Sequence, residues 1–176
     1  MKRCLVGSEM CIRDRNTSAE SVSSGWMNNT EPTTSVLTVV NDADVGTSGY
    51  TYVAYCFSEV KGFCKIGSFV GNGSSSGTFI HTGFRPAFFM LKRHEVASED
   101  WRICDAKRDP ENVLDRTLFP NLSNTEGDAD VMDFCANGVK LRTTDGGVNY
   151  DGREYIYLAF AEHPLVSSNG VAATAR

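Results

Sequence analysis

The sequence predicts an all-β protein that is built from many short antiparallel strands and contains little helix. Three observations lead to this prediction. Segments in which apolar and polar residues alternate recur along the chain. Clusters of turn-forming residues separate these segments, such as GNGSSSG at 71–77 and TTDGG at 143–147. Gly, Ser, Thr and Asn are plentiful and strong helix formers are scarce, which is typical of strands joined by turns.

Eight segments show the period-two alternation of a strand. In chain order they are residues 36–40, 50–57, 65–70, 78–81, 87–92, 101–105, 139–143 and 154–161. The stretch from Asp109 to Leu118 is ambiguous, because Asp109 and Pro110 could begin a helix and apolar residues follow at helical spacing. We favour a turn followed by a strand there. Residues 121–130, rich in Ser, Asn, Asp and Gly, are predicted to form a loop.

Residues 1–15, MKRCLVGSEMCIRDR, fit none of these elements. Gly7, Ser8 and Glu9 interrupt the apolar core that a signal peptide would need, and Cys4 and Cys11 have no neighbours that complete a zinc site. The six residues EMCIRD are what GAG ATG TGT ATA AGA GAC encodes, a string that resembles the transposase end of a sequencing-library adapter. We therefore interpret residues 1–15 as adapter-derived and expect the native start to be missing.

The charge of the chain argues against two classes of partner. The formal net charge is −5, and it becomes −7 when the four basic and two acidic residues of the first fifteen are left out. An acidic surface disfavours nucleic acid and anionic membranes as partners. No apolar run approaches the roughly 18–20 residues that a membrane-spanning helix needs, so no membrane insertion is expected.

Two segments of the chain echo each other. VGTSGYTYVAYCFSE at 45–59 matches VNYDGREYIYLAFAE at 148–162, with glycine, aromatic residues and a final glutamate in register. Both strands carry apolar residues on both faces, so both are predicted to be central in a sheet. The echo predicts a tandem arrangement, in which residues 16–59 end one β module, 60–165 form a second and 166–176 are a tail.

Several motifs of the chain resemble a known domain. They are GNGSSSGTFIHTGFRP from residue 71, W-x-I-x-D-x-x-R-D-P-x-N-V from residue 101 and YLAFAE from residue 157. Across residues 26–176 the chain resembles a repeated domain of uncharacterised function in tail-fibre-like and other virion proteins of marine tailed phages. The resemblance implies an antiparallel β-sandwich of the jelly-roll, concanavalin A or laminin-G kind, and a homo-oligomer that is a trimer by family analogy. It supplies no catalytic residues.

The resemblance also sets the expected function. It implies a non-enzymatic structural or host-surface adhesion module of a phage tail, with other virion proteins or a host surface glycan as partners. One alternative is a secreted, extracellular carbohydrate-binding lectin. A sandwich-fold glycoside hydrolase is a further alternative, but the predicted strands lack the paired carboxylates of such enzymes, as in E-x-D-x-x-E. His81, His94 and His163 lack paired ligand spacing.

The sequence offers one candidate metal site. Asp128 and Asp130 lie two residues apart, so that in an extended segment both carboxylates point to one side and could provide oxygen ligands for calcium. Acidic turns are common, however, and no EF-hand ladder is present. No other cofactor is expected. The GNGSSSG segment lacks the spacing and the following helix of a phosphate loop, and a long hairpin turn explains it better.

Aromatic residues with neighbouring arginines are the candidates for ligand binding. These residues are Phe84, Arg85, Trp101 and Arg102. Trp101 begins an alternating strand, however, so a place in the core is its favoured interpretation. Arg85 is expected to pair with a carboxylate, for which the candidates are Asp105, Asp109 and Glu162. Four cysteines are interpreted as small buried apolar residues, with disulfides as the alternative: Cys56, Cys64, Cys104 and Cys135.

Overall fold

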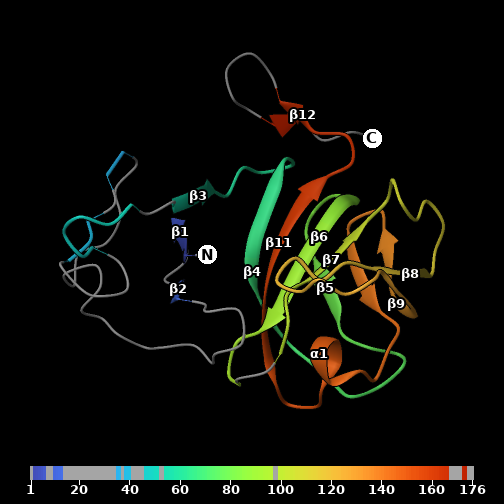
Figure 1. The fold of residues 1–176 in the computed structure, drawn as a ribbon. Helices are drawn as coiled ribbons and strands as arrows, with labels where there is room; N and C mark the ends of the chain where they lie inside the picture. The colour runs from blue at the N-terminus through green and yellow to red at the C-terminus, as the bar shows by residue number, and fades with distance from the viewer. Residues whose placement is uncertain are drawn as a thin grey trace.

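Two four-stranded antiparallel sheets form the body of the protein (Figure 1). The computed structural model describes residues 2–6, 10–13, 35–36, 38–40, 46–51, 54–96, 99–166 and 172–173. The first sheet contains β4 (Cys64–Val70), β11 (Glu154–Ala161), β6 (Pro86–Arg93) and β7 (Arg102–Asp105), in that spatial order. The second contains β5 (Phe79–His81), β10 (Gly138–Leu141), β9 (Gly127–Cys135) and β8 (Leu114–Thr117). The predicted all-β sandwich with little helix is confirmed.

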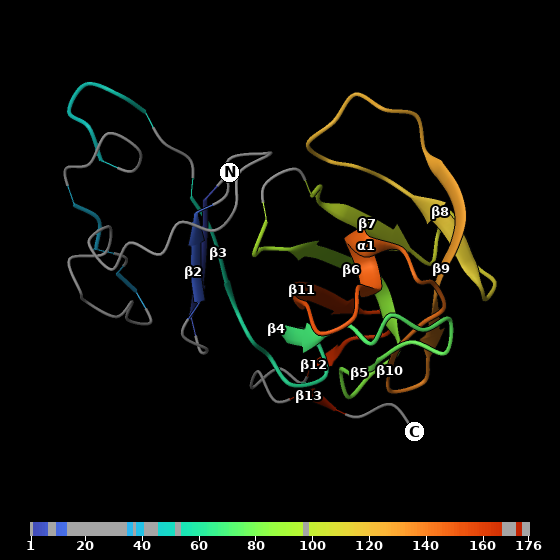
Figure 2. The ribbon, with the colours of Figure 1, turned by 90° about the horizontal axis from the view of Figure 1, so that it is seen from below.

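The core lies between these two sheets, which Figure 2 shows one beside the other. Alternation of side chains places Phe89 and Leu91 of β6, and Tyr155 and Tyr157 of β11, on the inner face of the first sheet. They pack against the second sheet, which contributes residues such as Phe134. On the first sheet's other face the buried apolar side chains include Ile66, Met90, Trp101, Ile156 and Leu158. Burial on both faces of β11 confirms that residues 154–161 form a central strand.

The first of the two similar segments, at 45–59, does not occupy a central position like that of the second segment. β3 (Ala54–Ser58) lies at the edge of a three-stranded sheet with β1 (Lys2–Val6) and β2 (Met10–Arg13), and it pairs in parallel with β1. Within the described ranges β3 has no second neighbour, so the prediction of a central strand is wrong there. The two echoing strands therefore do not occupy equivalent positions, and the division into modules stays a prediction.

The remaining predicted elements differ from the structure at a few places. Residues 36 and 38–40 are described but form no strand, so that prediction is wrong. β8 confirms the turn and strand predicted after Asp109. β9 begins at Gly127 and so takes in part of the predicted loop, because β8 supplies its ladder partner and Arg116 lies opposite Asp128. The other elements that were not predicted are β1, β2, the second half of β9, α1 (Gly146–Asn149), β12 (Leu165–Val166) and β13 (Ala172–Ala173).

Three cysteine side chains are described, and none of them is exposed. Cys64 and Cys104 are buried and Cys135 is half-buried, in line with the interpretation of small apolar residues. The side chain of Cys56 lies outside the described residues. Burial raises the pKa of the Cys104 thiol to about 11 and outweighs its hydrogen bond to Thr117, so this thiol is protonated at neutral pH. In the described part of the chain, no helix has the length and apolar character that crossing a membrane requires.

Candidate functional site

The four residues predicted to bind a ligand do not meet in one site. Arg85 precedes β6, and its Nε atom lies 2.7 Å from Glu162 Oε2, which agrees with the predicted carboxylate partner. Arg102 lies on β7 opposite Leu91, six residues further along β6. Because a strand rises about 3.3 Å per residue, the backbones of Arg85 and Arg102 lie roughly 20 Å apart. Phe84 packs against the core, and Trp101 is 5% exposed and packs with Met90 and Ile156.

The two aspartates proposed for calcium lie on β9. They occupy alternate positions of this strand, as predicted for an extended segment, and Asp128 is exposed. The side chain of Asp130 is not described. Among the residues that the structure describes, no three His, Cys, Asp or Glu side chains gather where they could hold a metal ion. The calcium site at Asp128 and Asp130 therefore stays a prediction.

Polar side chains gather instead at one end of the sandwich, which we name the loop end. It consists of residues 71–77, between β4 and β5, and residues 143–153, which contain α1 and lead into β11. α1 marks this end at the bottom of Figure 1. Gly71 N–H donates to the Arg153 carbonyl over 2.8 Å, and Gly152 N–H donates to the Gly71 carbonyl over 3.0 Å. These bonds hold the two segments side by side.

The fully buried side chain of Asn149 is the centre of the loop end. Its Oδ1 accepts a 2.9 Å hydrogen bond from the Asn72 backbone N–H. Its Nδ2 donates to Asn72 Oδ1 at 3.0 Å and to the carbonyls of Ser74 and Thr143, each at 2.8 Å. The Asn149 carbonyl also accepts from Gly73 N–H at 2.9 Å. One buried amide thus replaces the hydrogen bonds that an exposed loop would otherwise make to water.

Glycine is required at two positions of this loop. A Cβ atom on Gly71 would lie 2.3 Å from the Tyr150 carbonyl oxygen, a backbone atom that cannot move aside cheaply. Gly73 has a φ of 64°, in the left-handed region that glycine adopts without strain. The GNG sequence therefore permits close approach of two backbones and a tight reversal. This is a structural explanation of a motif that superficially resembles a phosphate loop.

Tyr155 supports the loop end from within the core. Its hydroxyl donates to the Gly146 carbonyl at 2.6 Å and accepts from Tyr150 N–H at 2.8 Å, while its ring stacks on Phe69 with centroids 5.0 Å apart. Burial raises the pKa of Tyr155, so the hydroxyl keeps the proton that it donates. This single side chain links the core to both ends of α1.

Arg102 ties β7 to the loop end. Its Nη2 lies 2.9 Å from Asp145 Oδ1, and Asp145 also caps α1 by accepting a 2.7 Å hydrogen bond from Gly147 N–H. The guanidinium carbon lies 5.4 Å from the centre of the Phe119 ring. A Cβ atom on Gly147 would lie 2.2 Å from Arg102 Nη2, so the guanidinium packs directly against this glycine. Arg102 therefore has a structural role in the fold.

We expect Gly147→Ala to displace Arg102 and to lower the free energy of unfolding by about 1 kcal/mol, the usual range for a partly exposed, hydrogen-bonded ion pair. The loss stays modest because the clashing atoms are the far end of a flexible side chain. Gly146→Ala is the matched control, since its Cβ would make ordinary contact at 3.5 Å with Tyr150. Urea unfolding of both variants measures the difference; equal stabilities would contradict the packing of Arg102 on Gly147.

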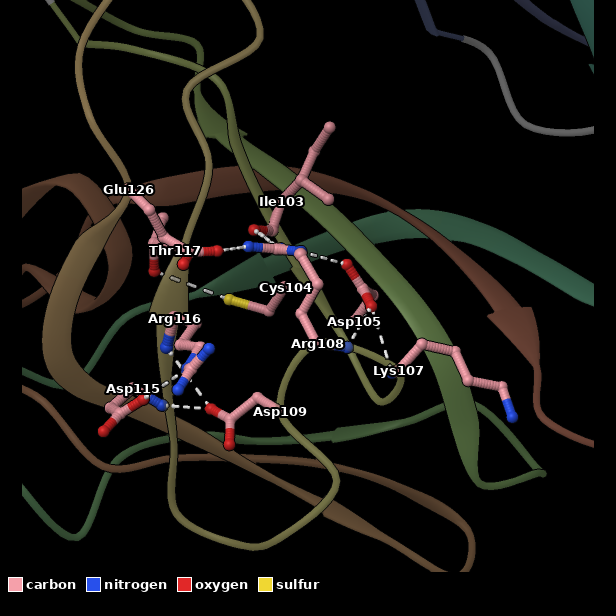
Figure 3. A network of polar contacts seen from close by, with 10 residues as sticks. All are labelled: Ile103, Cys104, Asp105, Lys107, Arg108, Asp109, Asp115, Arg116, Thr117 and Glu126. Carbon is pink, nitrogen blue, oxygen red and sulfur yellow. Dashed lines mark hydrogen bonds and ion pairs between the residues drawn. The ribbon is translucent and has the colours of Figure 1, made fainter.

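A second polar network joins the turn after β7 to the strand β8 (Figure 3). Arg108 Nε lies 2.5 Å from Asp105 Oδ2, and its Nη1 pairs with Glu126. Asp105 also accepts from the backbone N–H groups of Lys107 and Arg108 at 3.0 and 2.9 Å. Burial alone would raise the pKa of Asp105, but the hydrogen bonds and charge of Arg108 outweigh it and lower this pKa. These groups stabilise the turn after β7.

The lowered pKa of Asp105 predicts a pH dependence of stability. Because the folded-state pKa lies below the ordinary value of 3.8, the contribution of this carboxylate is fully present above 3.8 and is lost as the pH falls through the folded value. Asp105→Asn keeps the shape and an acceptor, and we expect it to cost about 1 kcal/mol at pH 7. The difference between the urea midpoints of the variant and the wild type should shrink as the pH is lowered below 3.8. A difference that does not change with pH would contradict this assignment.

The residues that organise the loop end escaped prediction from the sequence. Asn149 lies in NYDG, a segment whose composition is typical of a turn. Its hydrogen-bond partners lie far away in the sequence: Asn72 is 77 positions earlier and Ser74 is 75 positions earlier. The sequence contains one feature that could have indicated this contact. Two Gly- and Asn-rich turns, at 71–77 and 149–152, adjoin strands that pair with each other. Strands β4 and β11 are antiparallel neighbours with Glu154 opposite Val70, which brings these two turns together.

The fold and the loop end define the class of protein, an all-β sandwich module with clamped polar loops at one end. The model of a family described as a domain of unknown function (DUF7483) matches residues 2–164, and the chain belongs to this family. No curated protein and no solved structure matches the chain. The matched range includes residues 2–15, whose adapter origin stays a prediction.

Proposed function

We propose that the chain is a non-enzymatic adhesion or structural module of a tail-fibre-like phage virion protein, with a sandwich of the concanavalin A kind. The motif resemblance and the membership of an uncharacterised family support this proposal. The observation that carries it is the clamp at the loop end. An exposed loop, residues 72–76, is fixed to a rigid sandwich by the buried amide of Asn149.

The clamp suits a surface that binds without reacting. A loop that is ordered before binding loses little conformational freedom when a partner docks, so more of the contact energy appears as affinity. The loop is short and polar, and single contacts of this kind are weak. Several copies in one oligomer would raise the overall avidity without any new contact. Display on a symmetric virion fibre provides such copies, and a trimer is the expected form.

The polar groups of the sandwich also favour a structural role over catalysis. Arg85, Arg102 and Arg108 each pair with a carboxylate that holds two segments of the fold together. The Asp105 carboxylate has a lowered pKa, whereas a general acid needs a raised one. These assignments leave binding as the function that the loop end supports best.

Immunogold labelling with antibodies raised against the full chain tests the proposal. Purified tailed-phage particles whose genome encodes this chain should carry gold on the tail, and chain-specific peptides should appear in the purified virion fraction. Labelling confined to a secreted bacterial fraction would overturn the virion assignment and favour the lectin alternative. Serum raised against the same chain and preabsorbed with it serves as the control for nonspecific gold.

A further inference from the structure

Tyr150 presents an exposed aromatic ring on a fixed backbone at the loop end. It directly follows α1, and its side chain belongs to a residue that is 51% exposed. Its backbone N–H donates to Tyr155 Oη at 2.8 Å, and its carbonyl accepts from Arg153 N–H at 3.2 Å. The guanidinium carbon of the buried Arg93 lies 5.2 Å from the centre of the ring. This cation–π contact holds the ring in place from one side.

Residues with hydrogen-bonding side chains lie on the segments next to Tyr150. Asp151 is exposed and follows Tyr150 directly, and its Cβ lies 3.0 Å from the position that a Cβ on Gly73 would take. The carboxylate-bearing residue is therefore adjacent to the clamped loop. That loop exposes Asn72 and the three serines at 74–76. One aromatic ring, one carboxylate and the serine hydroxyls of the loop thus share one end of the sandwich.

We propose that Tyr150, Asp151 and residues 72–76 form a carbohydrate-binding site. A sugar ring would stack its C–H face on the exposed part of Tyr150, and its hydroxyl groups would donate to the Asp151 carboxylate and to the loop. The inference rests on the proposed adhesion function and names its site and ligand class. A single aromatic platform with a few fixed polar groups suits a saccharide, because protein partners usually meet several clustered apolar anchors.

The probe is an array of purified bacterial surface polysaccharides and their repeat-unit oligosaccharides, and the full chain is the binder. Tyr150→Ala should lower the affinity for bound saccharides about tenfold, since the stacking surface is lost. Asp151→Asn should lower it about threefold. Tyr50→Ala is the matched control, because Tyr50 is 74% exposed but lies outside the loop end. It should bind like the wild type.

Saturation-transfer NMR on the wild-type chain provides a second readout that does not depend on folding of a variant. Transfer from the ring protons of a single isotope-labelled Tyr150 to sugar protons is expected. Equal saccharide affinity for Tyr150→Ala and wild type, or transfer from Tyr50 instead, would overturn the site. If no saccharide binds while gold still labels phage tails, the ligand class is wrong and the adhesion or structural function stands. If both experiments fail, both proposals fall.

Discussion

Asn149→Asp is expected to lower the free energy of unfolding by about 3 kcal/mol, because it removes a buried hydrogen-bond donor and introduces a buried charge. The substitution keeps the size of the side chain. It replaces an NH₂ group that donates to Asn72 Oδ1 and to the carbonyls of Ser74 and Thr143 by an oxygen that repels all three. Urea unfolding at pH 7, followed by circular dichroism, measures the loss.

Two further variants make this result specific. Asn149→Ala removes the hydrogen bonds without adding charge, so we expect a smaller loss of about 2 kcal/mol. Asn124→Ala is the matched control, because Asn124 is exposed in the loop before β9 and should change stability by less than about 0.5 kcal/mol. An Asn149→Asp variant as stable as Asn124→Ala would show that the amide does not hold the loop end.

Phe89→Ala is expected to lower the free energy of unfolding by about 4 kcal/mol, the range for truncation of a fully buried phenylalanine. Phe89 lies on β6 at the centre of the core between the two sheets. Its ring stacks on Tyr157 of the neighbouring strand β11, with centroids 5.3 Å apart and an angle of 15° between the rings. Truncation leaves a cavity that the surrounding strands cannot fill without bending.

Phe79→Ala is the control for this core substitution. Phe79 lies on the edge strand β5 and is 44% exposed, so its truncation should cost about 1 kcal/mol. Thermal or urea unfolding of the two variants under one set of conditions gives the comparison. Equal losses of unfolding free energy for Phe79→Ala and Phe89→Ala would contradict a core between two stacked sheets. Such a result would mean that Phe89 is no more buried than the edge residue Phe79.

The strands were predictable where period-two alternation coincided with burial. The prediction for residues 154–161 matches β11 at both ends, since apolar residues on both faces require a central strand. The prediction failed for residues 36 and 38–40, which form no strand, and it missed β9 throughout. Alternation of Val, Leu and Thr is present in the former without a strand. In β9 the polar run GDAD forms a strand because β8 supplies backbone partners, information that no local pattern contains.

The candidate site was less predictable than the fold. An Arg85 pairing with a carboxylate was foreseeable because a strand-entry arginine needs a charged partner, and Glu162 was among the candidates. The role of Asn149 was not foreseeable, since it depends on which two turns the sheet order brings together. Trp101 and Arg102 illustrate the same limit. They are neighbours in sequence, yet Trp101, just before β7, packs with Met90 and Ile156, whereas Arg102 on β7 pairs with Asp145.

Amide hydrogen exchange of residues 72 and 73 tests the central claim most directly, namely that a buried amide holds an exposed loop in one conformation. Their N–H groups donate to Asn149 Oδ1 and to the Asn149 carbonyl. In the wild type both amides should exchange at least about a hundredfold more slowly than in an unstructured peptide. In Asn149→Asp this protection should fall sharply. Exchange at the unprotected rate in the wild type would contradict the claim.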